Sequence, residues 1–169
     1  MKQRILLFFC LTLPLSGFCQ SDTIYLHSGT VIGAEVKEIL PFTITYLPAD
    51  GKNQKAISKR AVQRIIYGNG NKVEEVSPFI SVQGETDWQK VILLDDQSET
   101  GGLAYSGEIK AEGGGKFIDS AQANTKAIMQ LKKEAAGRKC PYLYINSSRL
   151  KEVGYVGRLI KKSAVSYKY

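Results

Sequence analysis

The chain carries few of the residues that an enzyme active site needs. His27 is the only histidine, and it lies beside Ser28 at the expected end of a strand. A Ser-His-Asp or Cys-His site would have to use this histidine, and the sequence contains no Gly-x-Ser-x-Gly nucleophile motif. Zinc needs several histidine or cysteine ligands, whereas His27 and Cys140 are far apart in the sequence. We therefore expect an ordinary surface histidine, no enzyme activity, no bound metal and no cofactor.

One acidic cluster, Asp95, Asp96 and Glu99, has residue types that could still do chemistry. Clustered carboxylate oxygens can bind calcium, and a pair of carboxylates can act as acid and base in glycoside cleavage. The loop lacks the Asp-x-Asp-x-Asp-Gly spacing of a calcium site, and adjacent carboxylates commonly mark a solvated turn. We expect a solvated turn. A small carboxylate-dependent hydrolase remains an alternative, which a pocket around these acids would favour.

A glycine tract at 113–115 precedes Lys116, which suggests a phosphate-binding loop. Such a loop needs a glycine six residues before its lysine and a serine or threonine directly after it. Here position 110 is lysine and position 117 is phenylalanine. The motif fails, and the glycines are expected to form a flexible loop.

Tyrosine is the most suggestive residue type in the C-terminal part of the chain. A tyrosine combines an apolar ring with a hydroxyl group, which suits a partner surface, although tyrosines are also common on ordinary half-exposed strands. The candidates for a binding surface are Tyr142, Tyr144, Tyr155 and Tyr167, with Tyr169 at the end of the chain. An aromatic-lined groove beside basic side chains would favour a polysaccharide- or lipid-binding module.

Residues 20–76 carry the signals of a small, strongly bent β-sheet or barrel. Apolar and polar residues alternate in short runs, and turn sequences such as Asp50–Gly51 separate them. Ser58 is a candidate cap for a short helical turn before the last strand of this module. The polar run 72–77, followed by Pro78, marks the boundary of this module, and residues 77–87 are the expected linker to the next one.

Residues 88–169 are expected to form an α+β module in the order strand, strand, helix, strand, strand. Apolar residues recur at three- and four-residue steps after the glycine tract, which predicts a helix capped by Asp119 or Ser120 and ended by Gly137. The expected buried face holds Phe117, Ala121, Asn124, Ile128, Leu131 and Ala135. The module would be a four-stranded antiparallel sheet covered by one helix, so the whole chain is predicted to be α+β and β-rich.

The first module resembles Sm-like and SH3-like β modules. The resemblance covers about 50 residues, which end in the run Val62–Tyr67, and it rests on Leu26, Gly29, Ile32, Gly33 and Val36. It implies a small bent barrel of the kind that opens many exported bacterial proteins. The chain departs from the usual pattern because Ala34 directly follows Gly33. Ring assembly and RNA binding do not carry over from Sm-like proteins, because the loops lack an RNA-reading motif, so nucleic acid is an unlikely partner.

The second module, with its "GEIKAEG" strand and alanine-rich helix, resembles a bacterial envelope module. This resemblance covers about 65 residues. It implies an envelope or secreted setting and nothing catalytic.

Residues 1–19 have the layout of a secretory signal peptide. Lys2 and Arg4 form a positive start, an apolar run follows, and small or turn-forming residues precede Cys19. The apolar run is far shorter than the roughly 20 residues that span a bilayer, so we expect no transmembrane span.

Cys19 is either the last residue of the signal or the lipid anchor of a lipoprotein. A lipidated cysteine normally follows a small residue, whereas Phe18 is bulky. Cleavage after Cys19 places small residues, Gly17 and Cys19, at the two positions that signal peptidase reads. We favour this cut, which starts the mature protein at Gln20 and makes it periplasmic or secreted. An outer-membrane lipoprotein anchored through Cys19 is the alternative.

The mature chain would keep one cysteine, Cys140, and therefore no internal disulfide. We expect Cys140 to be partly buried, with pairing between two chains as the alternative. The leader holds two of the 23 basic residues and none of the 16 acidic ones, so the remaining chain has a formal charge of +5. A positive surface can attract anionic partners. The sequence predicts a non-catalytic binding or assembly module that meets an envelope protein or a polysaccharide.

Overall fold

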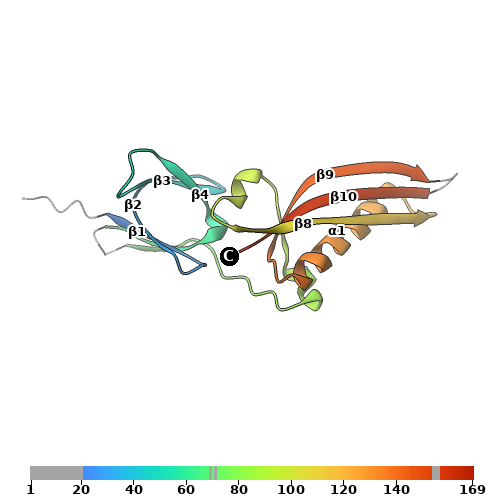
Figure 1. The fold of residues 1–169 in the computed structure, drawn as a ribbon, viewed down its shortest axis with the longest axis horizontal. Coiled ribbons are helices and arrows are strands. Elements are labelled where there is room, and N and C mark those ends of the chain that lie inside the picture. The colour runs from blue at the N-terminus through green and yellow to red at the C-terminus, as the bar shows by residue number, and fades with distance from the viewer. Residues whose placement is uncertain (1–20, 69, 71, 154–156) are drawn as a thin grey trace, which may run out of the picture.

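The structure is a computed structural model that describes residues 21–68, 70, 72–153 and 157–169. Two β-sheets lie end to end, and a single long helix packs against the second sheet (Figure 1). The fold is therefore α+β and dominated by strands, as predicted from the sequence. In the part of the chain that is described, no helix combines the length and the apolar character needed to cross a membrane.

The first sheet contains six antiparallel strands in the order β4-β3-β2-β1-β5-β6. Their bounds are β1 (Asp22–Leu26), β2 (Val31–Ile39), β3 (Thr43–Pro48), β4 (Lys55–Ser58), β5 (Val62–Ile66) and β6 (Val73–Glu75). Alternating residues such as Ile24, Ile44 and Ile65 form its core. A 3-10 helix, η1 (Lys59–Ala61), lets β5 return to pair with β1. Ser58 caps η1 as predicted, because its hydroxyl accepts the backbone N–H of Arg60 at 3.0 Å.

The second sheet has the strand order β7-β9-β10-β8. Its strands are β7 (Ile92–Leu94), β8 (Ala104–Lys116), β9 (Tyr142–Val153) and β10 (Gly157–Lys168), and the helix lies between β8 and β9 in the chain, as predicted. The sheet is mixed rather than wholly antiparallel, because β7 runs parallel to β9. These two strands begin side by side, where the N–H of Ile92 donates to the carbonyl of Pro141 at 2.9 Å, so they run in the same direction.

Helix α1 (Ser120–Gly137) begins and ends where the sequence predicts. The Asp119 side chain accepts the backbone N–H of Gln122 at 2.7 Å and so caps the helix. The buried face differs from the predicted one and consists of Ala123, Ala127, Leu131, Ala135 and Ala136. Only Leu131 and Ala135 belong to both sets, and Phe117 is 80% exposed. The helix turns its alanines to the sheet because they permit a close approach.

The glycine tract belongs to strand β8 and does not form a loop. A Cβ atom at Gly113 would lie 2.0 Å from the carbonyl oxygen of Ala123 and 2.4 Å from the amide nitrogen of Ala127. The backbone of α1 therefore rests directly on the backbone of β8. Glycine at 113 is required by this packing rather than by flexibility.

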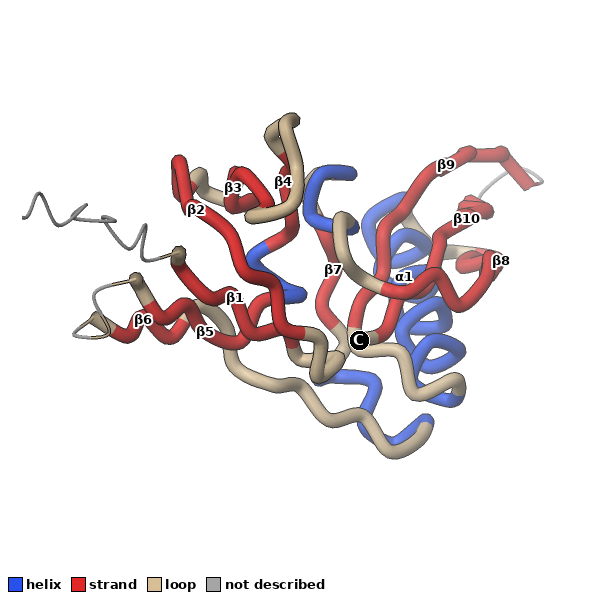
Figure 2. Tube along the Cα trace, turned by 60° about the vertical axis from the view of Figure 1, so that its left-hand side comes forward, coloured by secondary structure: helices blue, strands red, loops and turns tan. Residues whose placement is uncertain are grey.

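The segment 77–84 has no regular structure and runs along both sheets to a second 3-10 helix, η2 (Glu85–Lys90) (Figure 2). It is held at three points. The Ser77 hydroxyl donates to the carbonyl of Val62 at 2.8 Å, and the N–H of Ile80 donates to the Tyr169 hydroxyl at 3.0 Å. Val82 is buried in the core of the second sheet. The expected linker is therefore a strap that fixes one sheet to the other.

We expect Gly113→Ala to lower the free energy of unfolding by about 2 kcal/mol or more, because the new methyl group overlaps helix backbone that cannot move freely. Gly137→Ala is the matched control, since nothing lies within 4 Å of a Cβ built there. That control should gain about 0.5 kcal/mol from the lower entropy of the unfolded chain. Urea denaturation of both variants measures the difference, and equal stabilities would contradict the close packing.

Candidate functional site

The predicted acidic cluster lies at the junction of the two sheets, around a short 3-10 helix. Its three acids flank and form the 3-10 helix η3 (Gln97–Thr100), for which Asp96 is the N-cap and Glu99 completes a capping box. Glu99 is buried, so this part of the loop is not the solvated turn that we expected. The side chain of Ser98, and after it the Ser98 N–H, which donates to the Asp96 carboxylate at 2.7 Å, lower the pKa of this carboxyl group.

Glu99 connects η3 to the first sheet. One of its carboxylate oxygens accepts the N–H of Asp95 at 2.9 Å, and the other accepts from Arg60 Nε at 3.3 Å. Arg60 belongs to η1, so the ion pair joins the two halves of the chain. Within the described residues, no group of three or more histidine, cysteine, aspartate or glutamate side chains is arranged to hold a metal ion.

The predicted tyrosines differ in burial and do not form one surface. Tyr142 is fully buried rather than part of an exposed binding surface, and its hydroxyl lies 2.8 Å from the hydroxyl of Tyr169. Burial is the main cause that raises the Tyr142 pKa, and the hydrogen bond with Tyr169 adds to it. Tyr144 and Tyr167 are half-buried on β9 and β10, where they alternate with residues that face α1. Tyr155 lies outside the described residues.

Three aromatic rings gather where the first strand, the strap and the C-terminus meet. The ring of Phe79 stacks on that of Tyr169, with centroids 4.8 Å apart and an angle of 25° between the planes. The His27 ring lies 4.7 Å from Tyr169 and 5.7 Å from Phe79. Phe79 is nonetheless 61% exposed, so part of its ring is open to solvent.

His27 is a structural residue rather than an ordinary surface histidine. Its Nε2 atom lies 3.0 Å from the hydroxyl of Ser77, which also bonds the carbonyl of Val62. Burial lowers the pKa of His27 from its usual value, against smaller opposing contributions from Ser77 and Glu75. A neutral imidazole is thus favoured in this position, where it fixes the strap to the end of β1.

A groove of about 430 Å³ opens over this aromatic cluster, and we call it the junction groove. Four separate segments line it with aromatic, hydroxyl, amide and lysine side chains: His27, Ser28, Phe79, Ile80, Ser81, Val82, Gln83, Lys139, Pro141, Lys168 and Tyr169. Two lysines stand among these residues, and no aspartate or glutamate does. Two other grooves, of about 550 and 410 Å³, are lined by lysine or arginine together with glutamate. Among these three grooves, the junction groove is the one whose lining holds lysine without aspartate or glutamate.

Lys139 reaches the junction groove from a strained backbone position. It follows the C-cap of α1 with a φ angle of 57°, which is the left-handed conformation that glycine normally occupies there. The N–H of Cys140 donates to the carbonyl of Ala135 at 2.9 Å, and the N–H of Lys139 donates to Ala136 at 2.9 Å, which completes a Schellman motif. A glycine would fit this turn with less strain, which makes the Lys139 side chain a candidate for a role outside the turn.

Cys140 is fully buried beneath this turn, deeper than the partial burial that we expected. Its thiol faces the carbonyl of Arg138 at 3.5 Å. A disulfide between two chains would require this part of the core to open first.

No protein-family model matches the chain, and no curated protein or solved structure is significantly similar to it. No relative therefore supplies a function or a set of site residues. The sequence pointed to tyrosines in general but not to this groove, whose lining comes from four segments spread between residues 27 and 169. The sequence did contain two signals of this groove: an aromatic residue, Phe79, in the expected linker, and the single histidine, His27.

Glu99→Ala should lower the free energy of unfolding by about 3 kcal/mol, because it leaves Arg60 and two backbone N–H groups without their acceptor. Glu85→Ala is the control, since Glu85 is exposed and its ion pair with Lys133 is long at 3.9 Å. We expect that control to change stability by less than about 0.5 kcal/mol. Chemical denaturation measures both values, and a Glu99→Ala chain as stable as the wild type would rule out the proposed role of Glu99.

Proposed function

We propose that this protein is an exported, non-catalytic binding protein of the bacterial cell envelope, and that the junction groove is its ligand site. The observation that supports this most directly is the exposed ring of Phe79 in a groove that Lys139 and Lys168 also line, with no aspartate or glutamate in the lining. Ligand sites of this kind combine an apolar surface with a few polar groups that fix orientation. The acids at 95, 96 and 99 do not line this groove, which speaks against a carboxylate-dependent hydrolase.

The chemistry of the groove favours a sugar chain that carries acid groups. The C–H bonds of a sugar ring carry partial positive charge and pack on the negative face of an aromatic ring such as that of Phe79. Lysine ammonium groups pair with carboxylate, sulfate or phosphate groups of the ligand. Ser28, Ser81 and Gln83 add hydroxyl and amide groups that can bond sugar hydroxyls. We therefore propose an acidic polysaccharide of the envelope as the ligand.

Two features support the remaining parts of the proposal. The order β4-β3-β2-β1-β5, with a 3-10 turn before β5, is what an Sm-like or SH3-like module would have. Strand β1 begins at Asp22, so the proposed cleavage after Cys19 would leave the first sheet intact. The positive leader and its short apolar run support export.

Phe79→Ala should weaken the binding of an oligogalacturonate, a short polymer of acidic sugars, by about fivefold, because the stacking surface is lost. Phe117→Ala is the matched control, since Phe117 is 80% exposed at the far end of β8. Isothermal titration calorimetry measures both, with neutral dextran oligomers and vesicles of anionic lipid as competing probes. Equal binding by the two variants, or stronger binding to the vesicles, would overturn the groove assignment.

Lys139→Gly separates a binding role of this residue from a structural one, because the variant should gain stability and lose affinity. Glycine relieves the left-handed strain, so the melting temperature should rise with a gain of about 1 kcal/mol. Binding of the oligogalacturonate should weaken about tenfold, because a charged hydrogen bond is lost. A variant that is more stable and binds as well as the wild type would exclude Lys139 from the site.

Mass spectrometry of the protein from its native cell tests the export proposal. We expect a mature N-terminus at Gln20, which can cyclise to pyroglutamate. A diacyl mass on Cys19 would establish the lipoprotein alternative instead. Recovery of the intact 169-residue precursor as the soluble cytoplasmic form would overturn export altogether.

A further inference from the structure

Strand β8 forms an edge of the second sheet, and β10 is its only strand partner among the described residues. The strand is 13 residues long, which is unusual for an edge without cover. Arg138 reaches the carbonyl oxygen of Glu108 at 3.4 Å, so this carbonyl faces away from β10. Because backbone groups alternate in direction along a strand, the N–H and C=O groups of Lys110 and Glu112 also face outward.

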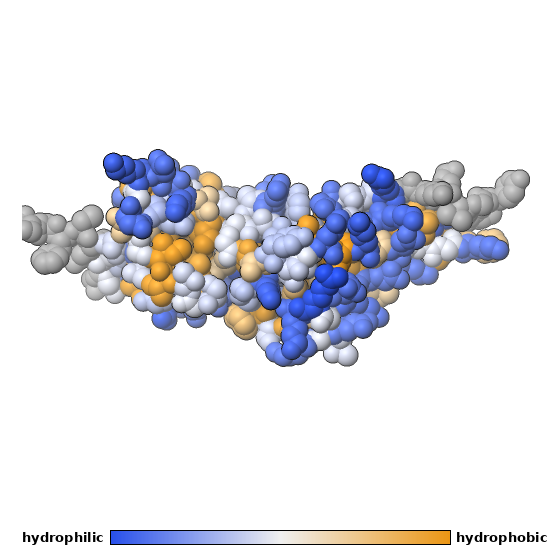
Figure 3. Space-filling view, viewed as in Figure 1, coloured by the Kyte–Doolittle hydropathy of each residue, from blue (hydrophilic) through white to orange (hydrophobic). Residues whose placement is uncertain are grey.

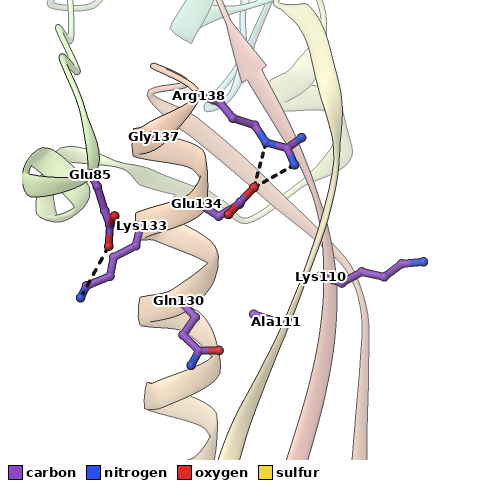
Figure 4. Close-up of a pocket in the computed structure, with 8 residues that line it drawn as sticks. All are labelled: Glu85, Lys110, Ala111, Gln130, Lys133, Glu134, Gly137 and Arg138. Atoms are coloured by element: carbon purple, nitrogen blue, oxygen red, sulfur yellow. Dashed lines mark hydrogen bonds and ion pairs between the residues drawn. The ribbon is translucent and has the colours of Figure 1, made fainter.

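A groove of about 550 Å³ runs beside this edge, between β8 and the C-terminal half of α1. In Figure 4, Ala111 points toward the helix and Lys110 points away from it. The charged side chains that α1 and its C-cap present to this groove are paired, Arg138 with Glu134 at 2.9 Å and Lys133 with Glu85 at 3.9 Å. Figure 3 shows mostly hydrophilic side chains over this part of the molecule. The groove is therefore polar, and it leaves space beside the outward backbone groups of β8 in which another strand could form hydrogen bonds.

The side chains along the edge alternate in charge, as Glu108, Lys110 and Glu112. If a second β8 runs antiparallel about a centre at Ala111, Lys110 of each copy lies opposite Glu112 of the other. Opposite charges at directly paired positions stabilise a sheet, and like charges destabilise it. Gly114 then lies opposite Glu108 of the second copy and presents no side chain to it. The edge is complementary to itself in this register.

We propose that β8 pairs with β8 of a second copy of this chain and forms an isologous two-fold dimer. The two four-stranded sheets would join into one sheet of eight strands, with both α1 helices on the same face. A two-fold interface needs a self-complementary surface, which the alternating charges of β8 supply. A register centred on Ile109 is less suitable, because Gly107 and Glu108, which Arg138 covers, would lie next to its centre, whereas a register centred on Ala111 pairs Glu108 only near its end. The dimer does not depend on the ligand proposal, since the junction groove is lined by other residues.

Sedimentation equilibrium of the full mature chain tests this dimer with a pair of charge reversals. Lys110→Glu and Glu112→Lys should each weaken self-association at least about tenfold, because each creates two like-charged contacts. An equimolar mixture of the two variants should dimerise again, because the mixed dimer has opposite charges at both contacts. Lys52→Glu, on an exposed loop of the first sheet, is the control and should associate like the wild type.

Backbone hydrogen exchange provides a measurement that needs no variant. The amides of Lys110 and Glu112 should become protected as the protein concentration rises. A wild-type chain that stays monomeric at about 100 µM, well above the Kd of a micromolar dimer, would overturn the proposal. So would a dimer without this protection, or one that survives both charge reversals. Failure of the mixture to dimerise would overturn the register centred on Ala111.

Discussion

The arrangement of the two sheets depends on one buried carboxylate, that of Glu99. Its oxygens accept from Arg60 of the first sheet and from the backbone at Asp95, which holds η3 in place. With η3 fixed, the N–H of Ser58 donates to the carbonyl of Gly101 at 2.9 Å, and Leu103 packs against the core of the first sheet. A buried charge is tolerated only when all its partners are present. The geometry of the junction is therefore specified closely, although the sheets have separate cores.

The junction groove is a consequence of this fixed geometry. Tyr169 ends the chain between the two sheets (Figure 1), where its hydroxyl accepts from the strap at Ile80 and meets the hydroxyl of Tyr142. Its ring then supports Phe79, whose outer surface stays exposed because the second sheet ends at this point. The rigid partners of Phe79 reduce the entropy that a ligand would have to overcome on binding. The aromatic cluster thus joins the two sheets and presents a binding surface at the same time.

Local signals in the sequence predicted the elements well and the contacts between them poorly. The cap at Asp119, the end of α1 at Gly137 and the order of strands and helix along the second module were predictable, because each depends on a few neighbouring residues. The buried face of α1 was not, because the position of Gly113 on β8 decides it, about ten residues before the helix contacts. Tyr142 and Tyr144 have the same residue type and similar neighbours. Tyr142 is buried at the junction, where it pairs with Ile92 of β7 and its ring and hydroxyl contact Tyr169.

The glycine tract of β8 affects both the packing of α1 on the sheet and the proposed pairing of two β8 strands. Because Gly113 lets α1 rest on β8, the helix is drawn toward the edge of the sheet and pairs its own charges there. Arg138 then reaches one outward carbonyl of β8, that of Glu108, and Lys110 lies between two glutamates along the same edge. An edge with isolated charges would be protected against pairing, whereas a regular alternation permits pairing in a complementary register. The packing requirement that makes glycine necessary at 113 therefore also leaves the neighbouring edge open to a second chain.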